Sequence, residues 1–156
     1  MPPSLSVDLN REFMLSVVLR DAEVILQELL NLKSAPRFDC VVPPGVKIEV
    51  PDITSQFLGL GFPGAYIQLE DDSEVLAHIG VVTVRTQGSL PHAYFAGGRS
   101  TKGKALVAAL AIAVANLVGS PIEDVSGHWM PREEFTPEEL RVAMMQCNSS
   151  ESDNCG

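Results

Sequence analysis

The segment from Gly98 to Ala105, GRSTKGKA, has the GxxxxGK spacing of a phosphate-binding loop. In such a loop, backbone amides hold phosphates, the lysine reaches the outer ones and a following hydroxyl binds magnesium. Ala105 replaces that hydroxyl, and the roughly fifty residues that follow are too few for a nucleotide-hydrolysing sheet. We therefore expect a basic loop that caps a helix. A simpler site for a phosphate or a partner's carboxylate remains an alternative.

The cysteines and histidines show no spacing typical of nucleophilic catalysis or metal binding. Cys40 could be activated by His92 or His128 only if the fold brought them together, and a cysteine beside two valines is typical of core packing. His78, His92 and His128 are far apart, without a carboxylate or thiol at metal-ligand spacing. We therefore expect no catalytic residue, metal or cofactor.

Acidic residues form three clusters beside expected turns and helix starts. Paired carboxylates do acid–base chemistry only when one of them is desolvated, which these positions do not favour. Two interpretations remain: solvated turns and helix starts, or a docking surface that attracts a basic partner. The clusters are Glu70, Asp71, Asp72 and Glu74; Glu123 and Asp124; and Glu133, Glu134, Glu138 and Glu139.

Trp129 is the only tryptophan and follows Gly127 and His128. Tryptophan is enriched both at interface hot spots and at the rims of hydrophobic cores. Both interpretations of Trp129 stay open.

The composition is that of an ordinary globular domain: 156 residues, 46% hydrophobic and 20% charged. The net charge of −9 favours cationic partners and disfavours nucleic acid and anionic membranes. The first residues, MPPSLSVDLN, lack the features of a signal peptide, and the longest apolar run, Ala105 to Ala115, is too short to span a membrane. Three widely spaced cysteines suggest a reduced, cytoplasmic protein.

Hydrophobic periodicity predicts the elements that position these residues. Apolar residues recur at helical spacing from Asp8 to Leu32, with Asp8 as the N-cap. Short β-rich runs follow between Cys40 and Phe95, with Glu70 to Ser73 as a hairpin connection and Gly80 as a bulge. The expected strands are Val46–Val50, Ala65–Leu69, Val75–Thr86 and, at an edge, Ala93–Ala96.

The C-terminal third predicts two helices. Residues 102–118 are apolar nearly all round, which is typical of a helix packed centrally on a sheet, and Gly119 ends it. A second helix begins with a capping box at Thr136 and runs to about Gln146. We therefore predict one α+β domain over residues 1–147 and a disordered tail over 148–156. The domain has an N-terminal helix, an antiparallel sheet of about four strands, a central apolar helix and a short C-terminal helix.

Residues 104–140 resemble small bacterial immunity proteins of contact-dependent inhibition and polymorphic toxin systems. The shared features are an alanine-rich helix, a turn at Ile122-Glu-Asp, a Gly-x-Trp ending at Trp129 and a TPEEL-type helix, about a quarter of the chain. The resemblance implies a cytosolic protein that binds a cognate toxin domain and blocks its active or substrate-binding surface. Many such toxins are cationic nucleases, and the resemblance assigns no contact residue.

We therefore expect an immunity protein that is a monomer in a 1:1 complex with a cognate, cationic nuclease domain. The expected partner-binding residues are Glu70, Asp71, Asp72, Glu123, Asp124, Glu133 and Glu134, with Trp129 as an anchor. Two alternatives differ in testable ways. An acidic secretion chaperone would form a homodimer and bind an effector segment, and a phosphate- or nucleotide-binding domain would use Gly98 to Ala105.

Overall fold

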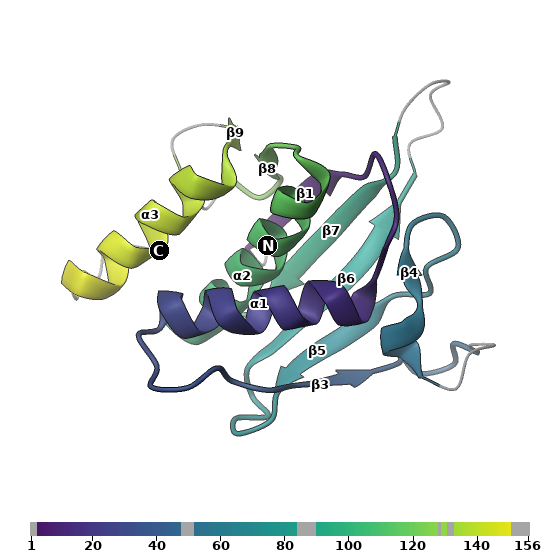
Figure 1. The fold of residues 1–156 in the computed structure, drawn as a ribbon, viewed down its shortest axis with the longest axis horizontal. Helices are drawn as coiled ribbons and strands as arrows, with labels where there is room; N and C mark the ends of the chain where they lie inside the picture. Colours follow the sequence, from purple (N-terminus) through teal and green to yellow (C-terminus); the bar gives the residue numbers. More distant parts are fainter. Residues whose placement is uncertain (1–2, 48–51, 84–89, 128, 131–132, 151–156) are drawn as a thin grey trace.

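A seven-stranded antiparallel sheet with helices on one side dominates the fold (Figure 1). The computed structural model describes residues 3–47, 52–83, 90–127, 129–130 and 133–150. The strand order is β3-β5-β6-β7-β1-β8-β9, and β2 and β4 form a separate two-stranded sheet. The strands are β1 (Ser4–Asp8), β2 (Phe13–Met14), β3 (Phe38–Val41), β4 (Phe57–Leu58), β5 (Ala65–Leu69), β6 (Leu76–Val82), β7 (His92–Gly97), β8 (Ile122–Asp124) and β9 (Glu134–Phe135). The helices are α1 (Leu15–Leu29), α2 (Thr101–Val118) and α3 (Pro137–Ser150), with a short 3-10 turn, η1, at Ile53–Ser55.

The N-terminal residues form a strand, so the prediction of a helix beginning at Asp8 was wrong. Asp8 ends β1, and α1 begins at Leu15 without a side-chain cap. Leu5 and Val7 alternate with serines, and this short run pairs with β7 on one side and β8 on the other. Pairing with distant strands outweighs the local helical periodicity here. The amphipathic character of the helix itself is confirmed over Leu15–Leu29.

The sheet has seven strands where about four were expected. The run Ala65–Leu69 is β5, and the run from Val75 contains β6. These two strands pair in antiparallel register across the expected hairpin connection. The expected Val46–Val50 strand is not a strand at residues 46–47, and its residues 48–50 lie outside the described part of the chain.

Two further expectations about the sheet were wrong. The run Ala93–Ala96 lies in β7, which is a central strand between β6 and β1 rather than an edge strand. Gly80 stands opposite Tyr94 in an unbroken ladder, so it forms no bulge. β7 is central because β1, which is far away in the sequence, pairs with it on the side opposite β6.

The central helix α2 is confirmed and is the most enclosed element of the fold. Every residue from Ala105 to Ala115 has at most 2% of its surface exposed. The helix lies over β1, β6 and β7 and contacts α1 and α3 on its other sides. Gly119 ends it with a left-handed φ of 70°, as expected. Within the described residues α2 is also the one helix with the length and hydropathy to cross a membrane, yet 78% of it is buried in this fold.

The C-terminal helix begins with the expected capping box. Thr136 N donates to Glu139 Oε1 at 3.0 Å, and Glu139 N donates to Thr136 Oγ1 at 3.0 Å. The helix ends at Ser150 rather than at about Gln146, so the first residues of the expected tail belong to it. Residues 151–156 lie outside the described part of the chain.

Candidate protein-binding surface

The Gly98–Ala105 segment does not form a phosphate-binding loop. Helix α2 already begins at Thr101, so Gly103 and Lys104 lie in its first turn, and the Ser100 hydroxyl accepts the Gly103 N–H at 3.0 Å. The preceding strand, β7, is antiparallel to both of its neighbours. A phosphate-binding loop requires free amides after a strand of a parallel sheet. The segment is therefore a capped helix start, as the sequence predicted.

Lys104 and Trp129 pack against each other on the helix side of the sheet. Lys104 is 8% exposed, and its Nζ lies 5.0 Å from the centre of the Trp129 ring. Trp129 is partly buried and packs against the hydrophobic core. Burial lowers the pKa of Lys104, and the nearby carboxylate of Asp124 acts in the opposite direction. Trp129 thus has a packing role in the free protein, and its role as an anchor stays a prediction.

The carboxylate of Asp124 organises the turn after β8. Its Oδ1 accepts hydrogen bonds from Ser126 N at 3.1 Å, Ser126 Oγ at 3.3 Å and Gly127 N at 2.7 Å. Its Oδ2 accepts from Trp129 N at 3.0 Å. An aspartate that accepts several backbone N–H groups stabilises a turn. Of the expected partner-binding carboxylates, Asp124 is therefore the one most occupied by the protein itself.

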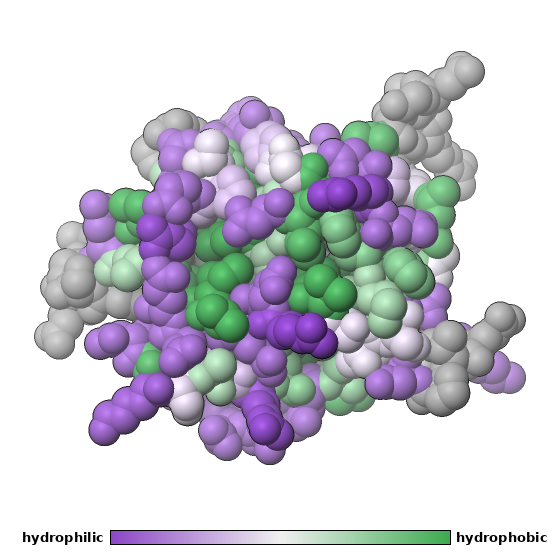
Figure 2. All heavy atoms as spheres, viewed as in Figure 1, coloured by the Kyte–Doolittle hydropathy of each residue, from purple (hydrophilic) through white to green (hydrophobic). Residues whose placement is uncertain are grey.

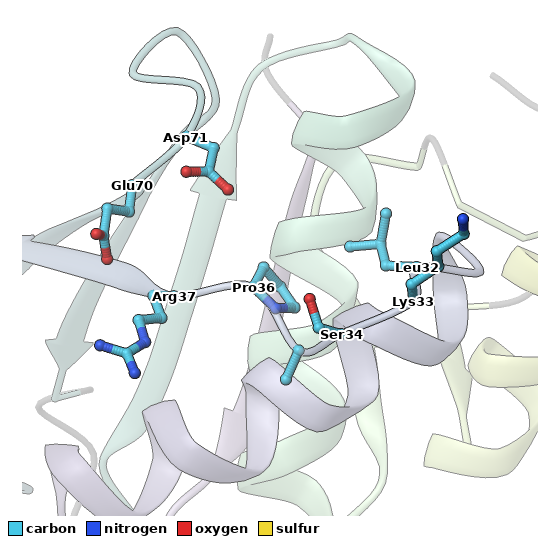
Figure 3. Close-up of a pocket in the computed structure, with 8 residues that line it drawn as sticks. Leu32, Lys33, Ser34, Pro36, Arg37, Glu70 and Asp71 are labelled. Atoms are coloured by element: carbon cyan, nitrogen blue, oxygen red, sulfur yellow. The ribbon is translucent and has the colours of Figure 1, made fainter.

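The cluster at Glu70 to Asp72 lies among basic residues. Glu70 and Asp71 line a hollow of about 370 Å³ together with residues 32–37, which include Lys33 and Arg37. In Figure 3, Arg37 and Glu70 lie at one end of the hollow and Leu32 and Lys33 at the other. Asp72 Oδ2 lies 3.9 Å from Lys102 Nζ. The local charge here is mixed, which weakens the attraction of this cluster for a cation.

Glu123, Glu133 and Glu134 remain a concentrated negative charge. All three are exposed, and no ion pair is described for them in the part of the chain that the structure covers. Glu123 stands directly opposite Glu134 in the β8–β9 ladder. By contrast, Glu139 belongs to the capping box and Glu138 bonds Arg141, which lowers the pKa of Glu138. Glu123, Glu133 and Glu134 form the terminal acidic cluster.

Cys40 lies on the helix-facing side of β3, paired with Ile67 and packed against the core. β5 and β6 separate β3 from β7, so His92 cannot act as its base, and His128 lies outside the described residues. Burial and, to a smaller extent, the charge of Asp52 raise the pKa of Cys40 to about 12. Within the described ranges, no three His, Cys, Asp or Glu side chains are grouped as metal ligands.

Cys40 is therefore expected to react slowly with thiol reagents. Because its pKa is raised from 9.0 to about 12, the neutral thiol persists well above pH 8 and the reactive thiolate is scarce. In a Cys147→Ser/Cys155→Ser variant, the reaction of Cys40 with DTNB at pH 8 should be at least about 100-fold slower than that of free cysteine. The same variant unfolded in urea is the control and should react at the ordinary rate. Equal rates in both states would contradict the burial of this thiol.

The helix-free face of the sheet carries aromatic residues that sequence reasoning did not single out. Tyr66 on β5 stands opposite His78 on β6, and their ring centres are 5.1 Å apart. Tyr94 on β7 lies on the same face and donates its hydroxyl proton to Ser4 Oγ at 2.9 Å. The signal was present, because each aromatic alternates with buried residues along its strand. The sequence of a single strand does not show which face of the sheet the helices leave uncovered.

The opposite, helix-covered side also exposes apolar side chains. Figure 2 views this side and shows apolar residues near its middle, over α1, surrounded by hydrophilic ones. Val24 of α1 is 59% exposed. This position provides a matched control for substitutions on the helix-free face.

No protein-family model, curated protein or solved structure matches this chain.

Proposed function

We propose that this protein is an immunity protein that binds a cognate toxin domain in a 1:1 complex and covers its active or substrate-binding surface. The partner is a basic nuclease domain, and the complex forms in the cytoplasm. The net charge of −9 supports a cationic partner, because opposite charge accelerates association and excludes polyanions. The resemblance of residues 104–140 to such proteins supports the same class.

The terminal acidic cluster is the observation on which this proposal mainly depends. Glu123, Glu133 and Glu134 are exposed and close together, and Glu123 and Glu134 face each other across two paired strands. A nuclease binds its substrate through cationic side chains that contact phosphates. Adjacent carboxylates can occupy such a cationic surface in place of the phosphates. Binding there would exclude the nucleic acid by charge and by bulk.

Contacts at the residues considered for catalysis favour binding over chemistry. The Ser100 hydroxyl accepts a hydrogen bond from Gly103 N, an amide that a phosphate would otherwise use. The raised pKa of Cys40 keeps its side chain in the neutral thiol form. Asp124 is engaged with the backbone of its own turn. Each of these side chains is therefore engaged in contacts within the fold itself.

The proposal predicts that a neighbouring reading frame encodes a basic nuclease domain, and inhibition of that domain by this protein tests it. Nuclease activity on plasmid DNA should fall to zero at one equivalent of the protein, and native mass spectrometry should show a 1:1 complex. Replacing Glu123, Glu133 and Glu134 together by lysine should weaken binding about 10- to 100-fold and reduce its dependence on salt. A Glu70→Lys/Asp71→Lys/Asp72→Lys variant is the matched control and should weaken binding less, because Lys33, Arg37 and Lys102 lie beside those charges and offset them.

Three outcomes would contradict the proposal. Unchanged affinity and salt dependence in the triple lysine variant would exclude the electrostatic mechanism. A stable homodimer that binds an extended effector segment would identify a secretion chaperone instead. Binding of ATP, GTP or phosphate that a Lys104→Ala change abolishes would identify an anion-binding domain.

A further inference from the structure

The large sheet has one face that no described helix covers. Side chains alternate between the two faces of a strand. Ile67, Ile79 and Phe95 point toward the helices and are fully buried, whereas their neighbours in sequence point the other way. The helices contact one another, so all three lie on the same side of the sheet. The residues that point away from them form what we call the open face.

The centre of the open face is aromatic and apolar. Tyr66, His78 and Tyr94 lie on the three adjacent strands β5, β6 and β7, and each is partly exposed. Exposed aliphatic side chains surround them: Val82 is 52% exposed, Val41 48% and Leu76 40%. Tyrosine is enriched in protein interfaces because it contributes a large apolar area together with a hydroxyl group.

The charges of the open face lie around this centre and are negative. At the outward positions of the described strands of the large sheet there is no lysine or arginine. Asp39 lies on β3, at one edge, and Glu123 and Glu134 lie on β8 and β9, at the other. Asp8 ends β1 and contacts His92. An apolar centre with a charged rim is the usual organisation of a protein–protein interface.

The pair of Glu123 and Glu134 gives an independent indication of what binds. Like charges directly opposite each other on neighbouring strands destabilise a sheet. Both carboxylates point to the open face, and the ladder register leaves them as direct neighbours. A sequence that breaks a local rule of sheet stability does so most often at a functional site. An arginine or lysine from a partner would remove the repulsion.

We infer that the open face is the docking surface for a cationic protein partner, with Tyr66, His78 and Tyr94 at the centre of the contact. Arginine and lysine side chains of the partner pair with the carboxylates of the rim. A second copy of this chain fits poorly, because it would bring one negative rim against another. The inference rests on the proposed function and assigns that function to one face.

A matched pair of lysine substitutions tests which face binds. Val82 on the open face and Val24 on α1 are similarly exposed, so either change should leave the fold intact. Val82→Lys should weaken binding of the toxin domain about tenfold or more, because it adds a like charge within the contact, and Val24→Lys should leave the affinity unchanged. The reverse pattern would overturn the inference while leaving the proposed function in place.

Two measurements that need no toxin domain test the inference independently. In NMR titration with an oligo-arginine peptide, backbone signals of β5 to β8 should shift and those of α1 should not. Shifts confined to residues 70–72 or to α1 would overturn the inference.

Glu134→Gln should raise the thermal unfolding midpoint of the free protein, and an unchanged or lower midpoint would remove the argument from charge repulsion. If the peptide binds the open face but no nuclease is inhibited, the proposed function fails and the docking surface remains.

Discussion

Replacing Phe95 by alanine is expected to lower the free energy of unfolding by about 3–5 kcal/mol. Phe95 lies in the central strand β7 with none of its surface exposed, opposite Leu5 of β1 and Ile79 of β6, which are also fully buried. Strand ladders fix β7 on both sides and α2 lies above it, so the cavity left by the ring cannot collapse. Urea unfolding followed by far-UV circular dichroism measures the change.

Two further variants show whether the effect comes from the cavity. Small domains have a total stability of about 5–15 kcal/mol, so Phe95→Ala alone could leave the protein unfolded. Phe95→Leu keeps most of the apolar volume and should cost less. Tyr94→Phe, the next residue but on the open face, removes only the hydroxyl bond to Ser4 and should cost about 1 kcal/mol. A cost below about 1 kcal/mol for Phe95→Ala would contradict a core centred on β7.

The parts of the fold that the sequence predicted are those determined by neighbouring residues. In α2, the apolar residues and the left-handed Gly119 that ends the helix all lie within a few turns of each other. In α3, the capping box at Thr136 involves only the first turn. The β5–β6 hairpin has its turn residues directly between its two strands. In each case the interaction that stabilises the element is local, so the pattern is complete in a short window.

The strands that the sequence missed depend on distant partners. β1 pairs with β7 and β8, whose residues lie far along the chain, and β8, which pairs with β9, joins the sheet through β1. Residues Ser4–Asp8 give only two apolar positions, Leu5 and Val7, and the helical periodicity that follows them is stronger. The number of strands and the central place of β7 follow from this pairing, which no single segment encodes.

For the candidate site, the sequence identified the acidic residues but not their surroundings. Nothing in the segment around Asp124 distinguishes a carboxylate that bonds its own turn from one free to meet a partner. The opposition of Glu123 and Glu134 exists only through the β8–β9 register. The aromatic residues of the open face come from three strands, and they become one surface only when the sheet is assembled and the helices cover its other side.

Replacing Asp124 by alanine is expected to cost about 2–4 kcal/mol of unfolding free energy, although no hydrophobic group is removed. The change leaves the N–H groups of Ser126, Gly127 and Trp129 without their acceptor, and each lost charge-assisted bond is worth about 1.5–3 kcal/mol before water replaces part of it. Because Trp129 is the only tryptophan, its fluorescence reports the turn directly. The emission of the folded variant should shift to longer wavelength.

A graded series identifies the bonds responsible for this effect. Asp124→Asn keeps an oxygen acceptor for Ser126 and Gly127 but presents an amide donor to Trp129 N. It should therefore cost roughly half as much unfolding free energy as Asp124→Ala and still shift the emission. Glu123→Ala, one residue away and exposed, is the control and should change stability by no more than about 0.5 kcal/mol. If Asp124→Ala and Glu123→Ala proved equal in stability and fluorescence, the carboxylate of Asp124 would not organise this turn. Asp124 would then be as free to meet a partner as the other expected contact residues.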